Sequence, residues 1–197
     1  MRKLIVVAIM SLDGYVAGPG GDVMVLPMDH SFDEYNLERM KAAGTSLLGA
    51  RSYRFFKGFW PTVEGNPAFG PVQQEFSRLD NAIPKVVVSD SLTADDTAPW
   101  TDTTTIVRRA DAHRAVAELK EGQESEGDIV VWASRVLWTD LLAAGLVDEL
   151  HLMIGPVVLG DGDAAFAGGK PPALTLIDIR TWEGSSNVLH RYAVANS

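Results

Sequence analysis

The segment from Asp128 to Phe166 constrains the fold of this chain more than any other stretch. Its first residues, DIVVWA, form an apolar run rich in β-branched side chains, which is typical of a strand buried on both faces. From Arg135 to Ala144 the apolar residues recur at helical spacing, and Gly145 follows where a left-handed helix end is expected. A second strand is predicted from Glu149 to Leu159, before Gly160-Asp161-Gly162 turns the chain.

Strand, helix and strand in this order form a βαβ crossover, whose first corner is built from the small residues Ala133 and Ser134. That order places the first amides of the helix at the carboxyl edge of a sheet, where they attract phosphate. Many α/β corners bind nothing, and the small residues then only let strand and helix pack closely. The pattern alone leaves both interpretations open.

The amino-acid sequence of this segment resembles that of the reductase domain of bacterial riboflavin biosynthesis and of its stand-alone relatives, which share the dihydrofolate reductase fold. The similarity lies in V-V-W before the corner and in L-W-x-D-L-L-A-A-G-L-V-D-E-L-x-L-x-I-x-P-V-V-L-G-x-G-x-x-x-F after it. In that family the corner is usually Gly-Ser or Gly-Gly and lies against the cofactor diphosphate, whereas this chain has Ala133. The resemblance implies that the cofactor is held here by Ala133, Ser134, Arg135 and Val136.

Length and composition limit the number of domains, the compartment and the partners that this chain can have. With 197 residues, the chain is expected to form a single domain over residues 1–197. It has no cysteine, which is compatible with a reducing compartment, and we expect a cytoplasmic protein. The 17 basic and 26 acidic residues give a net charge of −9, which argues against nucleic acid as a partner. No window reaches the roughly 20 apolar residues of a membrane helix, and the apolar start is interpreted as a strand rather than a signal peptide.

Several motifs of other enzyme classes are absent. The four histidines lie without ligand spacing, so we expect no metal cofactor. The sequence contains no P-loop, H-E-x-x-H motif or G-x-S-x-G elbow. A Rossmann dehydrogenase is not supported either, because the G-x-G-x-x-G fingerprint is missing.

The start of the chain predicts a strand and an exposed loop. Lys3 to Met10 is expected to be a strand buried on both faces, and Ser11 to Tyr15 leaves it. Asp13-Gly14 alone is a common turn dipeptide. In the resembled family, however, an S-L-D-G segment at this place lines the cleft where nicotinamide meets substrate. The resemblance therefore implies that the reacting centre is lined by Ile9, Asp13, Gly14 and Tyr15.

A helix is predicted from Ser31 to about Ala43, because Ser31 to Glu34 has the S-x-x-E form of a capping box and Gly44 stands at the end. Asp33 and Glu34 then serve the cap and the helix dipole. Alternatively, Asp33 faces the cleft, as the proton-relaying acid does on the corresponding helix of dihydrofolate reductases. The resemblance makes Asp13 and Asp33 the candidate catalytic acids, with a bound water as the other proton source.

A second strand-to-helix corner follows the short strand Thr45–Leu48. Its helix amides lie beside a cation and a hydroxyl, which suits a phosphate. The segment resembles the family's G-R-x-T-Y/W element, which implies cofactor contacts from Gly49, Ala50, Arg51 and Ser52. Ala50 stands where the family has arginine, so either Arg51 takes over or selectivity for the 2′-phosphate of NADP is relaxed.

The strand Pro84–Ser89 predicts the adenosine end of the same site. The family has serine followed by arginine or lysine here, against the ribose and its phosphate; Ser89 matches and Asp90 does not. An acid beside a ribose favours a free 2′-hydroxyl over a 2′-phosphate. The cofactor implied by the resemblance is NADPH, and Ala50 with Asp90 makes NADH an alternative.

The remaining segments complete the predicted fold. Phe55–Pro61 is expected to be irregular, with its aromatics forming either a minor core or, as the resemblance implies for Phe59 and Trp60, the substrate side of the cleft. Ala173–Trp182 and Asn187–Val194 predict a closing antiparallel hairpin. The chain is thus expected to be a three-layer α/β domain of dihydrofolate reductase type, with an eight-stranded mostly parallel sheet and about four flanking helices.

The function implied by the resemblance is hydride transfer from NAD(P)H to a pyrimidine or pterin-like heterocycle. The nearest named activity is 5-amino-6-(5-phosphoribosylamino)uracil reductase of riboflavin biosynthesis, and a homodimer is expected. Two alternatives remain: dihydrofolate reductase itself, and a non-catalytic nucleotide- or heterocycle-binding module, to which Ala50, Asp90 and Ala133 point. The hypothesis requires the Gly49 and Ala133 corners to face one another closely enough to hold one diphosphate.

Overall fold

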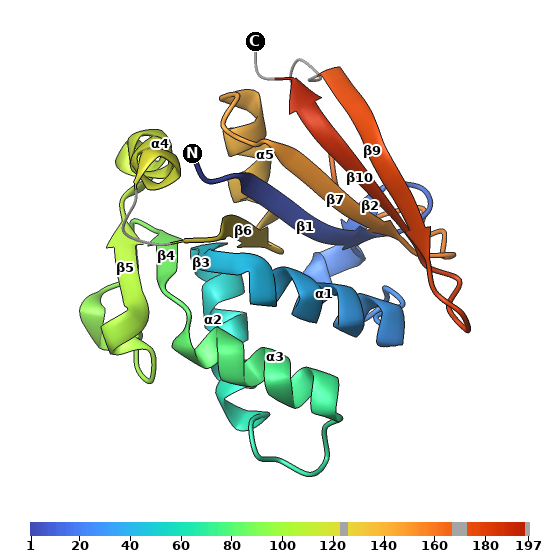
Figure 1. Ribbon diagram of the computed structural model, residues 1–197, viewed down its shortest axis with the longest axis horizontal. Coiled ribbons are helices and arrows are strands. Elements are labelled where there is room, and N and C mark those ends of the chain that lie inside the picture. Colours follow the sequence, from blue (N-terminus) through green and yellow to red (C-terminus); the bar gives the residue numbers. More distant parts are fainter. Residues whose placement is uncertain (123–125, 167–172, 196–197) are drawn as a thin grey trace.

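The computed structural model describes residues 1–122, 126–166 and 173–195. In this part of the chain an eight-stranded sheet lies between two groups of helices (Figure 1). Helices α4 (Ala112–Glu121) and α5 (Arg135–Ala143) cover one face. Helices α1 (His30–Ala42), α2 (Ala50–Phe59) and α3 (Pro71–Ala82) cover the other. The predicted three-layer α/β architecture is confirmed.

The sheet has the order β5-β4-β3-β6-β1-β7-β10-β9. Its strands are β1 Leu4–Met10, β3 Ala43–Gly49, β4 Lys85–Val88, β5 Thr104–Val107, β6 Asp128–Trp132, β7 Glu149–Ile154, β9 Ala173–Thr181 and β10 Val188–Ala195. A separate pair joins β2 (Tyr15–Ala17) to β8 (Asp163–Ala164). Short 3₁₀ turns include η1 Pro19–Gly21, η2 Trp60–Thr62 and η5 Arg109–Asp111.

Six strands of the sheet run parallel, and the C-terminal hairpin adds the antiparallel pairs β7–β10 and β10–β9. The crossover from β6 through α5 to β7 passes over β1, whose Val6 pairs with Val131 on one side and Leu150 on the other. Parallel strands end at one edge of a sheet. The carboxyl ends of β5, β4, β3, β6 and β1 therefore follow one another along that edge.

The core occupies both faces of the sheet. On the α4 and α5 side, Trp138 and Leu141 are fully buried against β1 and β6. On the other side, Tyr35 of α1, Tyr53 of α2 and Phe76 of α3 pack against the same strands. Burial of each large apolar side chain contributes about 1.5–3 kcal/mol, so both helical layers hold the carboxyl edge in place. None of the helices in these described ranges combines the length and apolar character needed to cross a bilayer.

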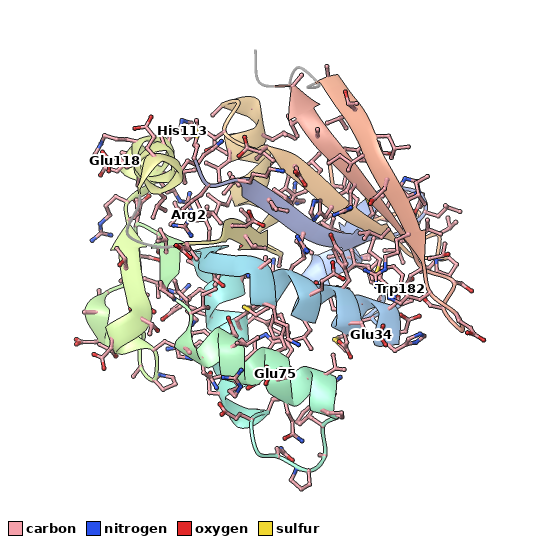
Figure 2. All side chains as sticks on the ribbon, viewed as in Figure 1. Arg2, Glu34, Glu75, His113, Glu118 and Trp182 are labelled. Carbon is pink, nitrogen blue, oxygen red and sulfur yellow. The ribbon has the colours of Figure 1, made fainter. Side chains whose placement is uncertain are left out.

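Asp29 caps α1, whereas the sequence pattern predicted a capping box at Ser31 and Glu34. The Asp29 carboxylate accepts hydrogen bonds from Ser31 N at 2.9 Å and Ser31 Oγ at 2.6 Å, and the helix begins at His30. Glu34 lies on the exposed side of the helix (Figure 2). The prediction was wrong because Ser31 donates to the preceding aspartate instead of accepting from the helix.

Helix α2 continues through Phe59, where irregular structure was predicted from Phe55 onwards. Tyr53 is buried, and Phe56 and Trp60 pack beside it in the same cluster, so the aromatic residues recur at helical spacing. Gly58 lies in open space and lowers helix propensity without making a turn. Tertiary packing of the aromatic stripe therefore overrides the local composition.

Two further boundaries and the number of helices differ from the sequence prediction. β7 ends at Ile154 rather than Leu159, because Pro156 has no N–H to continue the pairing. Gly44 belongs to β3 and does not end α1, which stops at Ala42. Five α-helices, rather than about four, are present in the described residues.

Candidate active site

Two strand-to-helix corners lie side by side at the carboxyl edge, because β3 and β6 are adjacent parallel strands. Gly49 N donates a hydrogen bond to Ser134 Oγ at 2.9 Å. Ser134 N in turn donates to Ser52 Oγ at 3.0 Å. The structure thus brings Gly49, Ser52 and Ser134 into direct contact, so the two predicted corners lie next to one another.

Each corner opens a helix whose first amides have no intrahelical partner. Gly49 is the N-cap of α2 and Ser134 the N-cap of α5. Within the described residues, no side chain accepts from the amides of Ala50 and Arg51 or of Arg135 and Val136. Two helix N-termini with free N–H groups create a positive potential that suits an anion such as a diphosphate.

Ala133 keeps the backbone shape that a glycine would give this corner. Its φ is 49° and that of Ser134 is 48°, both in the left-handed region. A side chain in this region costs roughly 1–2 kcal/mol, and such strain is found mostly at functional sites. Ala133 therefore adopts a conformation that glycine reaches without this cost.

One arginine stands at each corner. Arg51 is exposed, and its Nη2 donates to Gly20 O of η1 at 3.4 Å. The left-handed Gly21 lies so close to this guanidinium that an added Cβ would be 2.3 Å from Nη2. Arg135 Nη2 lies 4.0 Å from Asp163 Oδ1 of β8. The loop η1 and strand β8 thus border the two corners and their cations.

The end of β4 departs from the sequence hypothesis at Ser89. This side chain is 1% exposed, and its hydroxyl accepts the N–H groups of Ser91 and Leu92 at 3.1 and 3.0 Å. Ser89 therefore holds the turn after β4 instead of presenting its hydroxyl to a ribose. Asp90 is exposed and contacts Arg109 at the end of β5.

Asp13 ties the loop after β1 to the turn after β7. One carboxylate oxygen accepts from Ser11 Oγ at 2.6 Å and Leu159 N at 3.1 Å, and the other from Gly160 N at 2.7 Å. These hydrogen bonds, that of Ser11 first, lower the pKa of Asp13 to about 2. Asp13 is therefore ionised at neutral pH and serves as an acceptor rather than an acid.

Asp33 has the opposite environment, in the first turn of α1 and half-buried against α3. Gln73 Nε2 donates to Asp33 Oδ2 at 2.9 Å. Burial raises the pKa of Asp33, and the Gln73 hydrogen bond counteracts part of this effect. Asp33 makes no contact with Asp13 in the described ranges. It lines a cavity of about 20 Å³ with Phe32, Asn36, Trp60, Val72, Gln73 and Phe76.

The remaining substrate candidates divide between two places. Gly14, with φ 91°, and Tyr15 lie in the loop that Asp13 anchors, where Tyr15 OH is 3.5 Å from Gly160 O. Ile9 is 7% exposed and belongs to the core under α1. Phe59 and Trp60 contact one another at 5.0 Å between ring centroids, on the side of Asp33. The structure therefore groups Trp60 with Asp33, and Tyr15 with Asp13.

Three residues of the candidate site were not predicted from the sequence. Arg108 and Arg109 follow β5 directly, and two adjacent cations in an acidic chain were a signal for an anion site. Gln73 carried no signal, because only the packing of α3 against α1 brings it to Asp33. Among the described residues, no group of three or more His, Cys, Asp or Glu side chains has the arrangement of a metal site.

Fold and corners together define an α/β protein in which two helix N-termini meet at the carboxyl edge of a mostly parallel sheet. The model of the RibD C-terminal domain matches residues 2–190, and the chain belongs to this family. Membership supports a reductase role with a nicotinamide cofactor, and the predicted family is confirmed.

Similar proteins agree with this assignment. The chain is 27% identical over 184 residues to "Uncharacterized protein YyaP" of Bacillus subtilis (strain 168), covering 92% of this chain and 89% of that protein. A Thermotoga maritima protein described as a diaminohydroxyphosphoribosylaminopyrimidine deaminase/5-amino-6-(5-phosphoribosylamino)uracil reductase has a TM-score of 0.65 at 13% identity, covering 98% of this chain and 57% of that one. Dihydrofolate reductase from Enterococcus faecalis, complexed with NADP(H), has a TM-score of 0.57 at 12% identity, covering 98% and 96%. The last two show likeness of fold.

Proposed function

We propose that the protein is an NAD(P)H-dependent reductase of a pyrimidine or pterin-like heterocycle, with 5-amino-6-(5-phosphoribosylamino)uracil reductase as the nearest named activity. The observation that carries the proposal is the direct contact of the two corners through Ser134 and Gly49. Their free amides, with Arg51 and Arg135 beside them, would together hold one diphosphate. Family membership supports the same reading.

The residues present fit a nicotinamide dinucleotide laid along the carboxyl edge. Gly49, Ala50, Arg51 and Ser52 would hold its diphosphate from α2, and Ala133 to Val136 from α5. Its adenosine end would then lie toward β4 and β5, and its nicotinamide toward β1, because the strand ends follow in that order. When bound, the reduced nicotinamide supplies the hydride. The protein's own part is to orient the reactants and exclude water.

Proton delivery is assigned to Asp33 in this proposal. Its half-buried carboxyl has a raised pKa, which favours the protonated form that an acid needs. Asp13, whose pKa is lowered to about 2, instead anchors the loop that carries Gly14 and Tyr15. Trp60 lies next to Asp33 and offers an aromatic face to a planar heterocycle.

The decisive experiment is titration of the protein with NADPH and with NADH, followed by nicotinamide fluorescence. We expect binding of at least one of them, weakened about tenfold in Arg51→Gln and in Arg135→Gln, since each variant removes a charge-assisted contact to phosphate. Arg54→Gln is the matched control, because Arg54 is an exposed arginine one turn further along α2. Binding of neither nucleotide at millimolar concentration would favour the non-catalytic module.

Substrate class is tested in the same cuvette. Absorbance of NADPH should fall when the ribosylaminouracil phosphate is added, and Asp33→Asn should slow this reaction while leaving NADPH binding intact. Oxidation with dihydrofolate in place of that substrate would instead assign the protein to dihydrofolate reduction.

The proposal also includes a homodimer and a cytoplasmic location. The homodimer implied by the resemblance is supported by the uncovered apolar face of the C-terminal hairpin, where Leu174, Leu176 and Ile179 are 41%, 49% and 54% exposed. A cytoplasmic location is proposed because the chain contains no cysteine and so needs no oxidising compartment.

A further inference from the structure

Two exposed arginines at the carboxyl edge lie outside the proposed diphosphate site at the Gly49 and Ser134 corners. Arg108 and Arg109 follow β5, which pairs in parallel with β4 so that Val107 lies beside Val88. Ser89 N donates to Val107 O at 2.9 Å and extends this pairing by one residue. The arginines therefore leave the sheet next to Asp90, at the same edge as the Gly49 and Ser134 corners.

Both arginines hold the residue that the sequence analysis linked to NADH. Arg108 Nη1 donates to Asp90 O at 2.6 Å. The Asp90 carboxylate accepts from Arg109 N at 3.0 Å, and its other oxygen lies 3.6 Å from Arg109 Nε. Both carboxylate oxygens of Asp90 therefore face Arg109. An acid engaged in this way is a poor acceptor for a ribose hydroxyl.

The side-chain charges of Asp90, Arg108 and Arg109 sum to a net positive charge at the end of β5. Arg109 and Asp90 form an ion pair, whereas the one partner of the Arg108 side chain among the described residues is a carbonyl oxygen, so the trio carries one uncompensated positive charge. Asp111, the nearest further acid in sequence, bonds to Arg114 instead, at 2.7 Å. In a chain with a net charge of −9, this is a local positive site.

The position of the arginines matches the adenosine end of the proposed nucleotide. β5 is two strands from β3, a distance of about 10 Å along the edge. A nucleotide whose diphosphate lies at the Gly49 corner would extend its adenosine ribose in this direction, toward the strand end that Arg108 and Arg109 follow. A 2′-phosphate there would meet Arg108 and Arg109, whereas a free 2′-hydroxyl would gain little from either.

We propose that Arg108 and Arg109 select a 2′-phosphorylated nucleotide, so that NADPH is preferred over NADH, and that Asp90 positions this pair. The cation that the resembled family carries after β4 or at the start of α2 is thus supplied here from the end of β5. This inference rests on the proposed function, since it assumes that the corners hold the diphosphate.

The test measures both cofactors and two probes that lack the nicotinamide, adenosine 2′,5′-bisphosphate and AMP, by isothermal titration calorimetry. The native protein should bind NADPH at least tenfold more tightly than NADH, and the bisphosphate more tightly than AMP. Arg108→Gln should weaken NADPH and the bisphosphate about tenfold or more and change NADH and AMP less than twofold. Arg114→Gln, which removes an exposed cation from the neighbouring α4, is the control and should change none of the four.

Asp90→Asn tests whether Asp90 positions the arginines or accepts a hydrogen bond from the ribose. If Asp90 positions the arginines, this variant has the same affinity for NADH as the native protein. It also does not bind NADH more tightly than NADPH. If Asp90 accepts from the ribose, the variant lowers NADH affinity, which would overturn the inference. Equal binding of NADPH and NADH, or equal losses in Arg108→Gln, would also overturn it while leaving the proposed function intact. Binding of neither cofactor contradicts both.

Discussion

Ala133 holds a backbone conformation that glycine adopts without strain. Its φ of 49° places it in the left-handed region, next to Ser134 in the same region. We therefore expect Ala133→Gly to raise the free energy of unfolding by about 1 kcal/mol, because relief of strain outweighs the added entropy of the unfolded chain. Thermal unfolding followed by circular dichroism measures this change as a rise in Tm.

Ala115→Gly is the matched control for this prediction. Ala115 lies within α4, where glycine lowers stability by about 1 kcal/mol. The two variants make the same chemical change and should shift Tm in opposite directions. A loss of stability in Ala133→Gly would mean that the left-handed alanine is not strained.

Asp80 carries a second residue-scale prediction, because its carboxylate is fully buried. Neither of its oxygens has a hydrogen-bond partner in the described residues, and the ammonium of the buried Lys85 donates instead to the main-chain oxygens of Asp80 and Ile83. Burial raises the pKa of Asp80 to about 6, against the opposing effect of Lys85. Burial lowers the pKa of Lys85 to about 8, against the effect of Asp80.

The sign of the pH dependence follows from these directions. The folded state binds the Asp80 proton more tightly than the unfolded chain, whose carboxyl has a pKa near 4, so stability present below pH 4 is lost as pH rises to about 6. Two pKa units correspond to a loss of about 3 kcal/mol. Lys85 has the opposite sign, and its contribution rises between about pH 8 and pH 10. The combined contribution of Asp80 and Lys85 to the free energy of unfolding, measured with urea, should therefore be smallest between pH 6 and 8.

Asp80→Asn tests this assignment. The amide does not titrate, so the variant should lose less stability than the native protein between pH 4 and pH 7. Unfolding curves at these two pH values in both proteins give the comparison. Equal losses in the two proteins would show that other carboxyls cause the pH dependence.

Sequence reasoning at the residue scale succeeded where a pattern reports backbone shape. The corners at Gly49 and Ala133 were found because small residues mark the point where a buried strand turns into a helix, although Gly49 is extended and Ser134 is left-handed. It failed where tertiary neighbours decide the role of a side chain. Ser89 has the expected identity, yet its hydroxyl is taken by the turn it precedes. Asp90 suggested NADH until Arg109 was found against its carboxylate.

At the scale of elements, the start of α1 shows why periodicity finds a helix more reliably than its first residue. The Asp29 carboxylate accepts from Ser31 at the helix start and from Ser185 Oγ at 2.6 Å and Asn187 Nδ2 at 3.0 Å. These last partners lie more than 150 residues along the chain. No local pattern contains them, whereas the S-x-x-E form at Ser31 was visible and misleading.

Asp29→Ala should therefore destabilise the protein by about 2 kcal/mol, through loss of the cap and of the hydrogen bonds to the hairpin turn. Glu34→Ala, at the other residue of the predicted capping box, is the comparison. Glu34 is exposed on α1, and its replacement should change stability by less than about 0.5 kcal/mol. Urea unfolding of both variants decides between the observed cap and the predicted one, and a larger effect of Glu34→Ala would favour the capping box.

At the scale of the whole molecule, β-strand pattern and crossover order predicted the sheet, because each buried strand is a continuous apolar run. Strand β9, which ends the sheet beyond β10, is exposed along almost its whole length. On β10, Tyr192 and Val194 face the α5 side of the sheet, and they pair with Leu176 and Leu174 of β9. Ile179 pairs with His190 on the same face. No helix of the described residues covers this apolar surface.

An exposed edge strand with an apolar face is a site of association, and a twofold axis lets one such face pack against its own copy. We expect the protein to sediment at twice 21.3 kDa at micromolar concentration. Leu176→Asp should shift it to the monomer mass, since a carboxylate at the centre of the interface loses its hydration without a partner. Met24→Asp, at an exposed methionine on a different segment, should leave the mass unchanged. Sedimentation of the native chain as a monomer, or a dimer that survives Leu176→Asp, would place the contact elsewhere or remove it.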